Sequence, residues 1–210
     1  MIRTTAGRLV LAIGLVMGLG GADWRQFRGP NGSGVAEDSR VPVDWDSENS
    51  IAWRADLPGR GLSAPIIVGD RVVVTCSSGA DQDRLHVVCF DAETGEKRWE
   101  RRFWATGRTM CHPKTAVASC TPTSDGERIF AQFSSNDVVC LDMDGALQWY
   151  RGLGSDYPNA SNSLGMASSP LVVDETLIVQ VENDSMDSFA AGLNVHNGEN
   201  RWKISRPSKA

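Results

Sequence analysis

A short acidic stretch near the end of the chain holds the side chains best suited to bind a metal ion. Glu182, Asn183, Asp184 and Asp187 lie in a window of six residues, and carboxylate and amide oxygens are ligands that Ca²⁺ prefers. Runs of this kind usually form solvated hairpin tips, so we predict no metal site here. Glu182 and Asn183 are kept as candidates for facing a ligand of another kind.

Two connections between apolar segments supply the other candidates. His112 and Lys114 lie in the long connection 104–117, and Asn162 lies in a polar loop farther along. Loops carry function more often than cores do, so these side chains would face a ligand if the chain binds one; the alternative is that they are merely solvated. The other two histidines fall in predicted strands or turns, which gives no basis for a Ser-His-Asp triad. We predict no catalytic residue.

A repeat organises the elements that would position these residues. Three segments each place a glycine four residues before a tryptophan, and the tryptophans are 50 and 53 residues apart. The pairs are Gly95 with Trp99, Gly145 with Trp149, and Gly198 with Trp202. Upstream of each pair, a serine precedes a proline, and an apolar strand, a polar turn and a second apolar strand follow. Self-similarity at this period is typical of stacked repeat architectures.

Each repeat predicts four short strands. In the first repeat, alternation and β-branched residues place the strands near 63–68, 71–76, 85–91 and 97–103. The sequence Asp91–Gly95 predicts a hairpin turn, because glycine supplies a positive φ and aspartate bonds its own backbone. A four-stranded antiparallel unit of this length indicates a propeller blade, whose apolar faces need neighbouring blades. A solenoid of meanders or a pair of β-sandwiches is the alternative.

The repeated tryptophans favour a docking role over a ligand-stacking one. Each indole could wedge against the next blade while its N–H finds a backbone carbonyl. Cys89, Cys140 and Gly192 share one place in the repeat, which indicates a position for small side chains in the blade interior.

The complete motif Asp-x-x-Thr-Gly-x-x-x-Trp at Asp91–Trp99 resembles the pyrroloquinoline quinone (PQQ) repeat of eight-bladed β-propellers. The segments 23–35 and 45–66 look like the start of secreted PQQ-like proteins of planctomycete-type bacteria. The resemblance implies an all-β fold, a partial propeller of about three blades covering 62–210 (62–104, 117–152 and 166–205). It also implies that the segment 23–61 supplies, through Ser50–Leu57 and Trp53, the outer strand that closes the ring.

Three units are less than half of an eight-bladed ring. We therefore expect the chain to be the N-terminal part of a longer propeller whose missing blades are its partners. The alternative is that identical chains assemble a ring. In a monomer, the last sheet would expose an apolar face around Leu177, Ile178 and Val179.

The first 22 residues predict an export signal. Arg3 and Arg8 precede an apolar run over 9–19, and the small residues Gly20 and Ala22 suit cleavage before Asp23. The run is too short to span a bilayer, although an uncleaved anchor is the alternative. We expect a periplasmic or extracellular protein that is not inserted in a membrane after cleavage.

The cysteines and the charge narrow the functional classes. Five cysteines are scattered over the chain, so no disulfide framework is predicted, and a bridge between Cys111 and Cys120 is left open. The net charge is −5 and no basic run occurs, which argues against nucleic acid and anionic membranes as partners.

The resemblance implies two functions. The first is a non-catalytic binding or scaffolding module, similar to the propeller of the outer-membrane barrel-assembly machinery, that binds envelope or extracellular proteins without a cofactor. The second is an alcohol or sugar dehydrogenase that uses PQQ and Ca²⁺. The chain has neither an adjacent cysteine pair nor a Cys-x-x-Cys-His haem motif, both of which occur in many such dehydrogenases. We favour the binding module.

Overall fold

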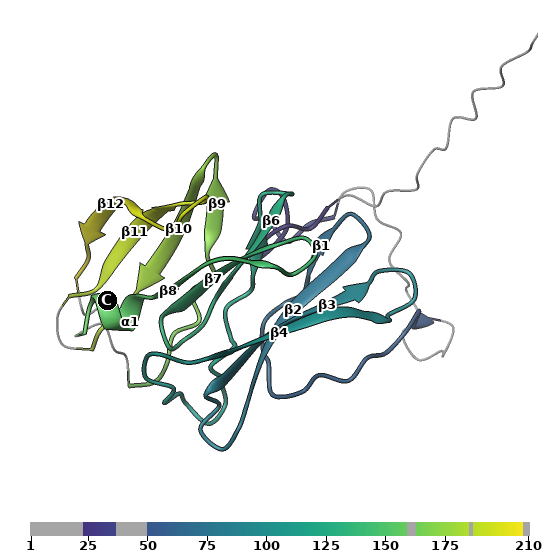
Figure 1. Cartoon of the computed structure of the whole chain (residues 1–210), viewed down its shortest axis with the longest axis horizontal. Coiled ribbons are helices and arrows are strands. Elements are labelled where there is room, and N and C mark those ends of the chain that lie inside the picture. The colour runs from purple at the N-terminus through teal and green to yellow at the C-terminus, as the bar shows by residue number, and fades with distance from the viewer. Residues whose placement is uncertain (1–22, 37–49, 159–162, 185–186, 208–210) are drawn as a thin grey trace, which may run out of the picture.

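Three antiparallel four-stranded sheets follow one another along the chain (Figure 1). The structure, a computed structural model, describes residues 23–36, 50–158, 163–184 and 187–207. The predicted export signal and Asn162 lie outside these residues. The strands of each sheet are hydrogen-bonded in chain order, as four successive hairpin-linked strands must be. The all-β prediction and the partial propeller are confirmed.

The first sheet contains β1 (Ile66–Val68), β2 (Arg71–Ser78), β3 (Arg84–Asp91) and β4 (Lys97–Trp104). The second contains β5 (Thr123–Ser124), β6 (Arg128–Gln132), β7 (Asp137–Asp142) and β8 (Leu147–Gly152). The third contains β9 (Leu171–Val173), β10 (Thr176–Val181), β11 (Phe189–Asn194) and β12 (Asn200–Ser205). One short helix, α1 (Leu153–Asp156), follows β8. Among the described residues, no helix is long and apolar enough to cross a membrane.

Alternating side chains build the core between the sheets. In β3, Leu85 and Val87 belong to a buried cluster that also contains Ile129 and Val139 of the second sheet. A second cluster joins the other face of the second sheet to the third sheet through residues such as Phe130. Successive strand residues point to opposite faces, so the central sheet is covered on both sides by its neighbours.

The third sheet corrects one prediction. Leu177 and Val179 are buried against the second sheet, whereas Ile178 between them is partly exposed. The expectation that all three lie on the free face was wrong, because neighbouring residues of a strand point to opposite faces, so Ile178 lies on the other face from Leu177 and Val179. The exposed apolar side chains of this sheet are instead Leu171, Val173, Trp202 and Ile204.

The segment before the first sheet attaches to it without forming a strand over 51–57. The outer strand predicted for Ser50–Leu57 would pair with a last blade, and no sheet that could be this blade lies among the described residues, so that pairing stays a prediction. Sheet-type contacts are made elsewhere: Trp24 forms a bridge with Ile67, and Arg60 forms one with Ser77.

Alanine substitutions at two turn glycines test whether the tryptophan of one sheet packs closely on the turn of the next. Gly198 has φ +74°, and a Cβ there would lie 2.8 Å from the ring of Trp149; Gly69 has φ +57° with nothing within 4 Å. Alanine at either position would have to adopt a left-handed backbone conformation, which lowers the free energy of unfolding by about 1 kcal/mol. At Gly198 the clash with the indole ring lowers it by about 1–3 kcal/mol more. We expect urea unfolding to show Gly198→Ala clearly less stable than Gly69→Ala. Equal losses would contradict close packing of the indole on this turn.

Candidate functional site

Three tryptophans, Trp53, Trp99 and Trp149, each lie on the hairpin turn of the following unit. The indole N–H groups donate to backbone carbonyls in three equivalent pairs: Trp53 to Ala92 (3.0 Å), Trp99 to Met143 (3.0 Å) and Trp149 to Val195 (2.8 Å). In each pair the ring also covers the turn glycine. Trp53 thus lies against the first sheet as the tryptophan of a preceding blade would.

An arginine two residues after the tryptophan adds a second bond that the sequence analysis missed. The Nε of Arg101 donates to the Gly145 carbonyl at 2.6 Å, and Arg151 donates to the Gly198 carbonyl at 2.7 Å. The signal in the sequence is the shared Trp-x-Arg, which the third repeat replaces with Ile204.

A third set of bonds links the inner ends of the sheets. The backbone N–H of Ala64 donates to the Thr121 hydroxyl at 3.1 Å, and the N–H of Thr121 donates to the Ser169 hydroxyl at 3.0 Å. Each of these residues precedes the proline of its repeat. The conserved geometry explains why two of the three positions carry a hydroxyl.

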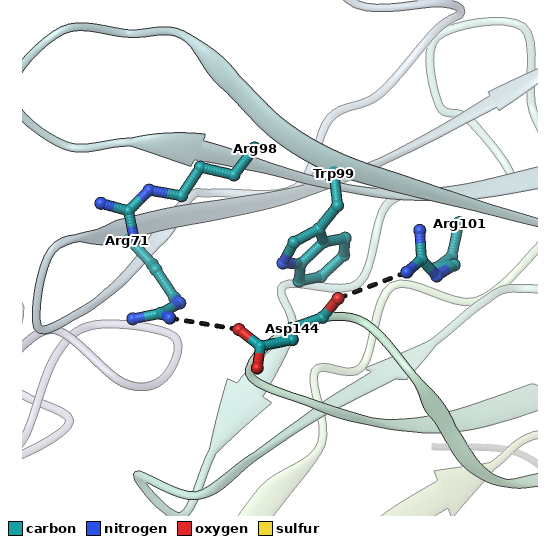
Figure 2. A pocket seen from close by; sticks show the side chains of 5 residues that line it. All are labelled: Arg71, Arg98, Trp99, Arg101 and Asp144. Atoms are coloured by element: carbon teal, nitrogen blue, oxygen red, sulfur yellow. Dashed lines mark hydrogen bonds and ion pairs between the residues drawn. The ribbon is translucent and has the colours of Figure 1, made fainter.

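The junction between the first two sheets contains a shallow hollow of about 610 Å³, lined by Arg71, Arg98, Trp99, Arg101 and Asp144 (Figure 2). Its guanidinium groups already have acceptors. Arg98 pairs with two carboxylates of its own sheet, and the bond from Arg98 is the main cause that holds the pKa of Asp91 far below its usual value. Arg71 pairs with Asp144 at 3.4 Å. We interpret the hollow as a structural junction.

A second hollow of about 580 Å³ lies at the opposite ends of these strands, between the β2–β3 hairpin and the connection after β4. Its lining consists of Ala80, Asp81, Gln82 and the segment Gly107–Cys111. The predicted candidates His112 and Lys114 follow this segment directly. The N–H of His112 donates to the Leu164 carbonyl (2.9 Å), and its Nδ1 accepts the N–H of Lys114 (3.1 Å).

Large apolar side chains are exposed in the lining of this second hollow and in segments next to that lining. Met110 is 56% exposed, Leu164 61% and Trp104 61%. The guanidinium carbon of Arg84 lies 4.3 Å from the centre of the Trp104 ring. We call Trp104, Met110 and Leu164 the rim patch. Exposed apolar groups next to cationic ones are typical of surfaces that bind proteins.

The other predicted ligand-facing residues lie near the same end of the molecule but do not converge. The carboxylate of Glu182 accepts from the Gln180 amide at 2.5 Å. Asn183 is buried, and its backbone N–H donates to the Ser188 hydroxyl at 2.9 Å. Asp184 accepts the N–H of Ser163 at 2.7 Å, and bonds from Ser163 together with the charge of Arg108 lower its pKa.

The structure also brings Ser78, His86 and Glu100 into a series of hydrogen bonds, although His86 gave no basis for a catalytic triad in the sequence. The Ser78 hydroxyl lies 2.7 Å from Nε2 of His86, whose Nδ1 lies 2.9 Å from Glu100. The three residues come from adjacent strands of the first sheet, so the pairing register, unknown from sequence, decides their contact. His86 is buried and neither hollow includes these side chains, so the chain of bonds links strands on the first sheet's outer face.

The comparisons with known proteins agree with this repeated geometry. The model of the family described as "Outer membrane protein assembly factor BamB", a PQQ-repeat family, matches residues 33–209. The chain belongs to this family. No curated protein is significantly similar to it in sequence.

Two solved quinohemoprotein structures show the same propeller fold, and a third solved structure is a weaker match. A quinohemoprotein alcohol dehydrogenase from Comamonas testosteroni is 17% identical with a TM-score of 0.65, covering 90% of this chain and 28% of that one. The quinohemoprotein alcohol dehydrogenase ADHIIG from Pseudomonas putida HK5 is 14% identical with a TM-score of 0.61, covering 89% and 27%. BamB from Moraxella catarrhalis is 18% identical with a TM-score of 0.46, covering 73% and 42%. This PQQ-repeat chain therefore spans less than half the length of each.

The described residues do not fit a Ca²⁺ ion of the kind that a quinone-dependent propeller enzyme would need. The oxygens of Glu182 and Asp184 are bonded to different partners, and Glu182 also lies 3.9 Å from a guanidinium nitrogen of Arg206. In the described ranges, no three His, Cys, Asp or Glu side chains are grouped as metal ligands. We derive no step through PQQ or a metal.

All five cysteines, each of them among the described residues, are free thiols. The bridge left open between Cys111 and Cys120 is not formed. Burial raises the pKa of Cys76 and Cys89 to about 11 and that of Cys120 and Cys140 to about 12. Cys111, at the second hollow, is the one partly exposed thiol.

Thiol titration tests this division. Only thiolates react with Ellman's reagent, so the native protein at pH 8 should show one fast thiol. That thiol should disappear in Cys111→Ser, while Cys140→Ala should leave it unchanged. Fast reaction of two or more thiols in the native state would contradict the burial of the others.

The same thiols predict a loss of stability at high pH. Their pKa is higher in the folded state than in the unfolded state, where a thiol has a pKa of about 8.5. Their stabilising contribution is complete below about pH 8.5 and is lost as the pH rises toward 11–12, by up to about 1.4 kcal/mol per thiol and pH unit. Urea unfolding between pH 8 and 10 should show this fall. In Cys140→Ala, the free energy of unfolding should fall less steeply with rising pH, because one buried thiol is missing.

Proposed function

We propose that this PQQ-repeat propeller is a non-catalytic binding or scaffolding module for envelope or extracellular proteins, working without a cofactor. The family to which the chain belongs carries the description of an outer membrane protein assembly factor. The observation that carries the proposal is the rim patch: Met110 is exposed in the hollow, Leu164 is exposed where its carbonyl accepts from His112, and Trp104 is exposed at the end of β4, just before the connection that lines the hollow. Burial of such side chains by a partner releases about 25 cal/mol per Å² of apolar surface.

The positions of two arginine side chains support a protein partner at the rim patch. Arg84 lies over Trp104, and Arg108 lies in the hollow beside Met110. Aromatic residues, methionine and arginine are enriched at protein–protein interfaces. The backbone N–H of His112 donates to the Leu164 carbonyl at 2.9 Å and so links the two loops of the rim.

Site-specific photo-crosslinking in the native host tests the proposal. A photoreactive residue replaces Met110 in one variant and Leu147 in the other; Leu147 is 51% exposed at the start of β8, away from the rim. We expect a discrete envelope-protein adduct from position 110 and none from 147. Equal patterns at both positions, or none at 110, would overturn the assignment of the rim.

The alternative, a quinone- and Ca²⁺-dependent dehydrogenase, predicts a different result. Addition of PQQ and Ca²⁺ would then give quinone absorbance bound to the protein and dye-linked oxidation of alcohols. We expect neither, and a positive result would replace our proposal.

We also propose export through residues 1–22. Amino-terminal sequencing of the protein isolated from its host should begin at Asp23. A start at Met1 in a soluble cell fraction would contradict export.

A further inference from the structure

A group of basic side chains lies beside the second hollow. Arg60 precedes the first sheet, and its Nη2 donates to the Pro113 carbonyl at 2.6 Å. Lys114 follows Pro113, and Arg108 lies in the lining of the hollow, where its Nη2 is 3.0 Å from the Met110 sulfur. Arg60, Arg108 and Lys114 are exposed, and we call these three residues the basic rim.

The basic rim differs from the arginines of the first hollow in its partners. Arg71 and Arg98 each pair with carboxylates. The ion pairs formed between described residues include none of the three basic-rim side chains. The bonds of the two basic-rim guanidinium groups go to a neutral carbonyl and a neutral sulfur, so their charge is available to a ligand.

Two carboxylates near the hollow already have partners. Asp83 pairs with Arg84 at 3.1 Å, and these two groups neutralise each other. Asp184 accepts bonds from Ser163, and the charge of Arg108 is the smallest of the causes that lower its pKa. Asp184 therefore offsets part of the charge of Arg108.

The positive charge stays in excess at Arg60 and Lys114. Asp81 is exposed in the lining of the hollow, but it forms no ion pair with either residue. The imidazole of His112, two residues before Lys114, is also exposed and adds positive charge whenever it is protonated. This local excess lies on a chain whose net charge is −5.

The place of the basic rim in the fold leaves it accessible beside any neighbouring sheet. Residues 79–83 and 105–115 connect strands at one end of the first sheet. The three sheets pack through their faces, in two buried clusters. A further sheet packed in the same way on the first or the third sheet would therefore leave this end open.

Apolar side chains lie directly beside these charges. Met110 is 56% exposed and Leu164 is 61% exposed. The Leu164 carbonyl accepts the N–H of His112, which brings Leu164 close to the loop of Lys114. A ligand that fits the whole surface needs carboxylates for the cations and apolar side chains for Met110 and Leu164. A peptide segment can present both within a few residues.

We propose that the basic rim and the rim patch together bind an acidic segment of the partner protein, in which glutamate or aspartate stands next to apolar residues. The inference rests on the proposed function, because it names the part of the partner that this surface takes. Carboxylates would pair with Arg60 and Lys114 while apolar side chains cover Met110 and Leu164. Opposite charges on two such surfaces accelerate association and fix its orientation.

Fluorescence anisotropy with two labelled peptides tests the inference on the purified protein. One peptide repeats Glu-Leu-Ser. The other repeats Gln-Leu-Ser, which has the same length and apolar content but no side-chain charge. We expect the glutamate peptide to bind at least about tenfold more tightly, and we expect this preference to shrink at high salt because exposed charges are screened.

A double variant and a matched control assign the preference to the basic rim. Arg60→Gln combined with Lys114→Glu should abolish it. Arg54→Glu is the control, because Arg54 is exposed next to Trp53, which lies on the turn at the other end of the first sheet. The control should bind both peptides as the wild type does. Circular dichroism checks that the variants fold.

Equal or undetectable binding of the two peptides to the wild type would overturn the inference. A preference that survives the double variant, or one that Arg54→Glu loses to the same extent, would also overturn it. The photo-crosslink at position 110 separates these results from a failure of the proposed function. An adduct at 110 with equal peptide binding leaves the binding module and removes the acidic segment, whereas no adduct at 110 removes both.

Discussion

Replacing Asp137 by alanine should lower the free energy of unfolding by about 4 kcal/mol. The carboxylate is fully buried at the start of β7. It accepts bonds from the Thr106 backbone N–H (3.0 Å) and hydroxyl (2.5 Å), from the Ser135 hydroxyl (2.6 Å) and from the Tyr150 hydroxyl (2.7 Å). Alanine would leave these donors without their acceptor in a region that excludes water. For a chain of this size the loss corresponds to about 8–16 °C in melting temperature.

Asp144→Ala is the matched control. Its side chain is 90% exposed and pairs with Arg71 at 3.4 Å, so we expect a change within about 0.5 kcal/mol. Urea unfolding monitored by tryptophan fluorescence measures both variants. If Asp137→Ala costs no more than Asp144→Ala, Asp137 does not hold the connection after β4 against the second sheet.

The buried role of Asp137 shows what the sequence could not reveal. Asp137 stands in a polar stretch, Ser134–Asp137, that has the composition of a solvated hairpin. One donor, Ser135, is a close neighbour in the sequence, but Thr106 and Tyr150 lie 31 positions earlier and 13 positions later, and only the packing of two sheets brings them to Asp137. Local composition carries no record of such a contact.

The strands, in contrast, were largely predictable. Alternation and turn residues placed the four strands of the first repeat within a few residues of β1–β4, because both signals are local. The free face was mispredicted for Leu177 and Val179, since a sequence shows alternation but not which phase faces inward. The pairing of the closing strand stays a prediction: Trp53 lies where expected on the first sheet, but the blade that this strand would join is not among the described residues.

The candidate site was predicted only in part. The connection containing His112 does border a hollow, as a long loop between repeats suggested. The rim patch was not anticipated, because exposed methionine and leucine look like core residues in a sequence. The Trp-x-Arg bonds were visible as a pattern, but the carbonyl that each arginine meets belongs to the next repeat.

Replacing Trp149 by alanine should cost about 3–5 kcal/mol. The ring is only 8% exposed, packs in the cluster between the second and third sheets, and donates to the Val195 carbonyl at 2.8 Å. Alanine removes the buried area and leaves that carbonyl without its donor. Trp149→Phe keeps most of the area but loses the bond, so about 1–2 kcal/mol should be lost.

Replacing Trp202 by alanine in the last repeat tests whether the loss at Trp149 comes from packing on the next unit or from removing a tryptophan from an outer strand. Trp202 is 37% exposed and no further sheet lies against it in the described residues, so Trp202→Ala should cost under about 1 kcal/mol in dilute solution. Chemical denaturation of both alanine variants gives the comparison. A loss of β-strand propensity would lower the free energy of unfolding by a similar amount at both positions, because both tryptophans lie in the outer strand of their sheet. A large loss at Trp149 and a small one at Trp202 would mean that the tryptophan stabilises the fold only when the next unit supplies a turn to receive it. Equal losses would mean that each sheet uses its tryptophan for itself, and the propeller would then be held together chiefly by the apolar clusters between its sheets.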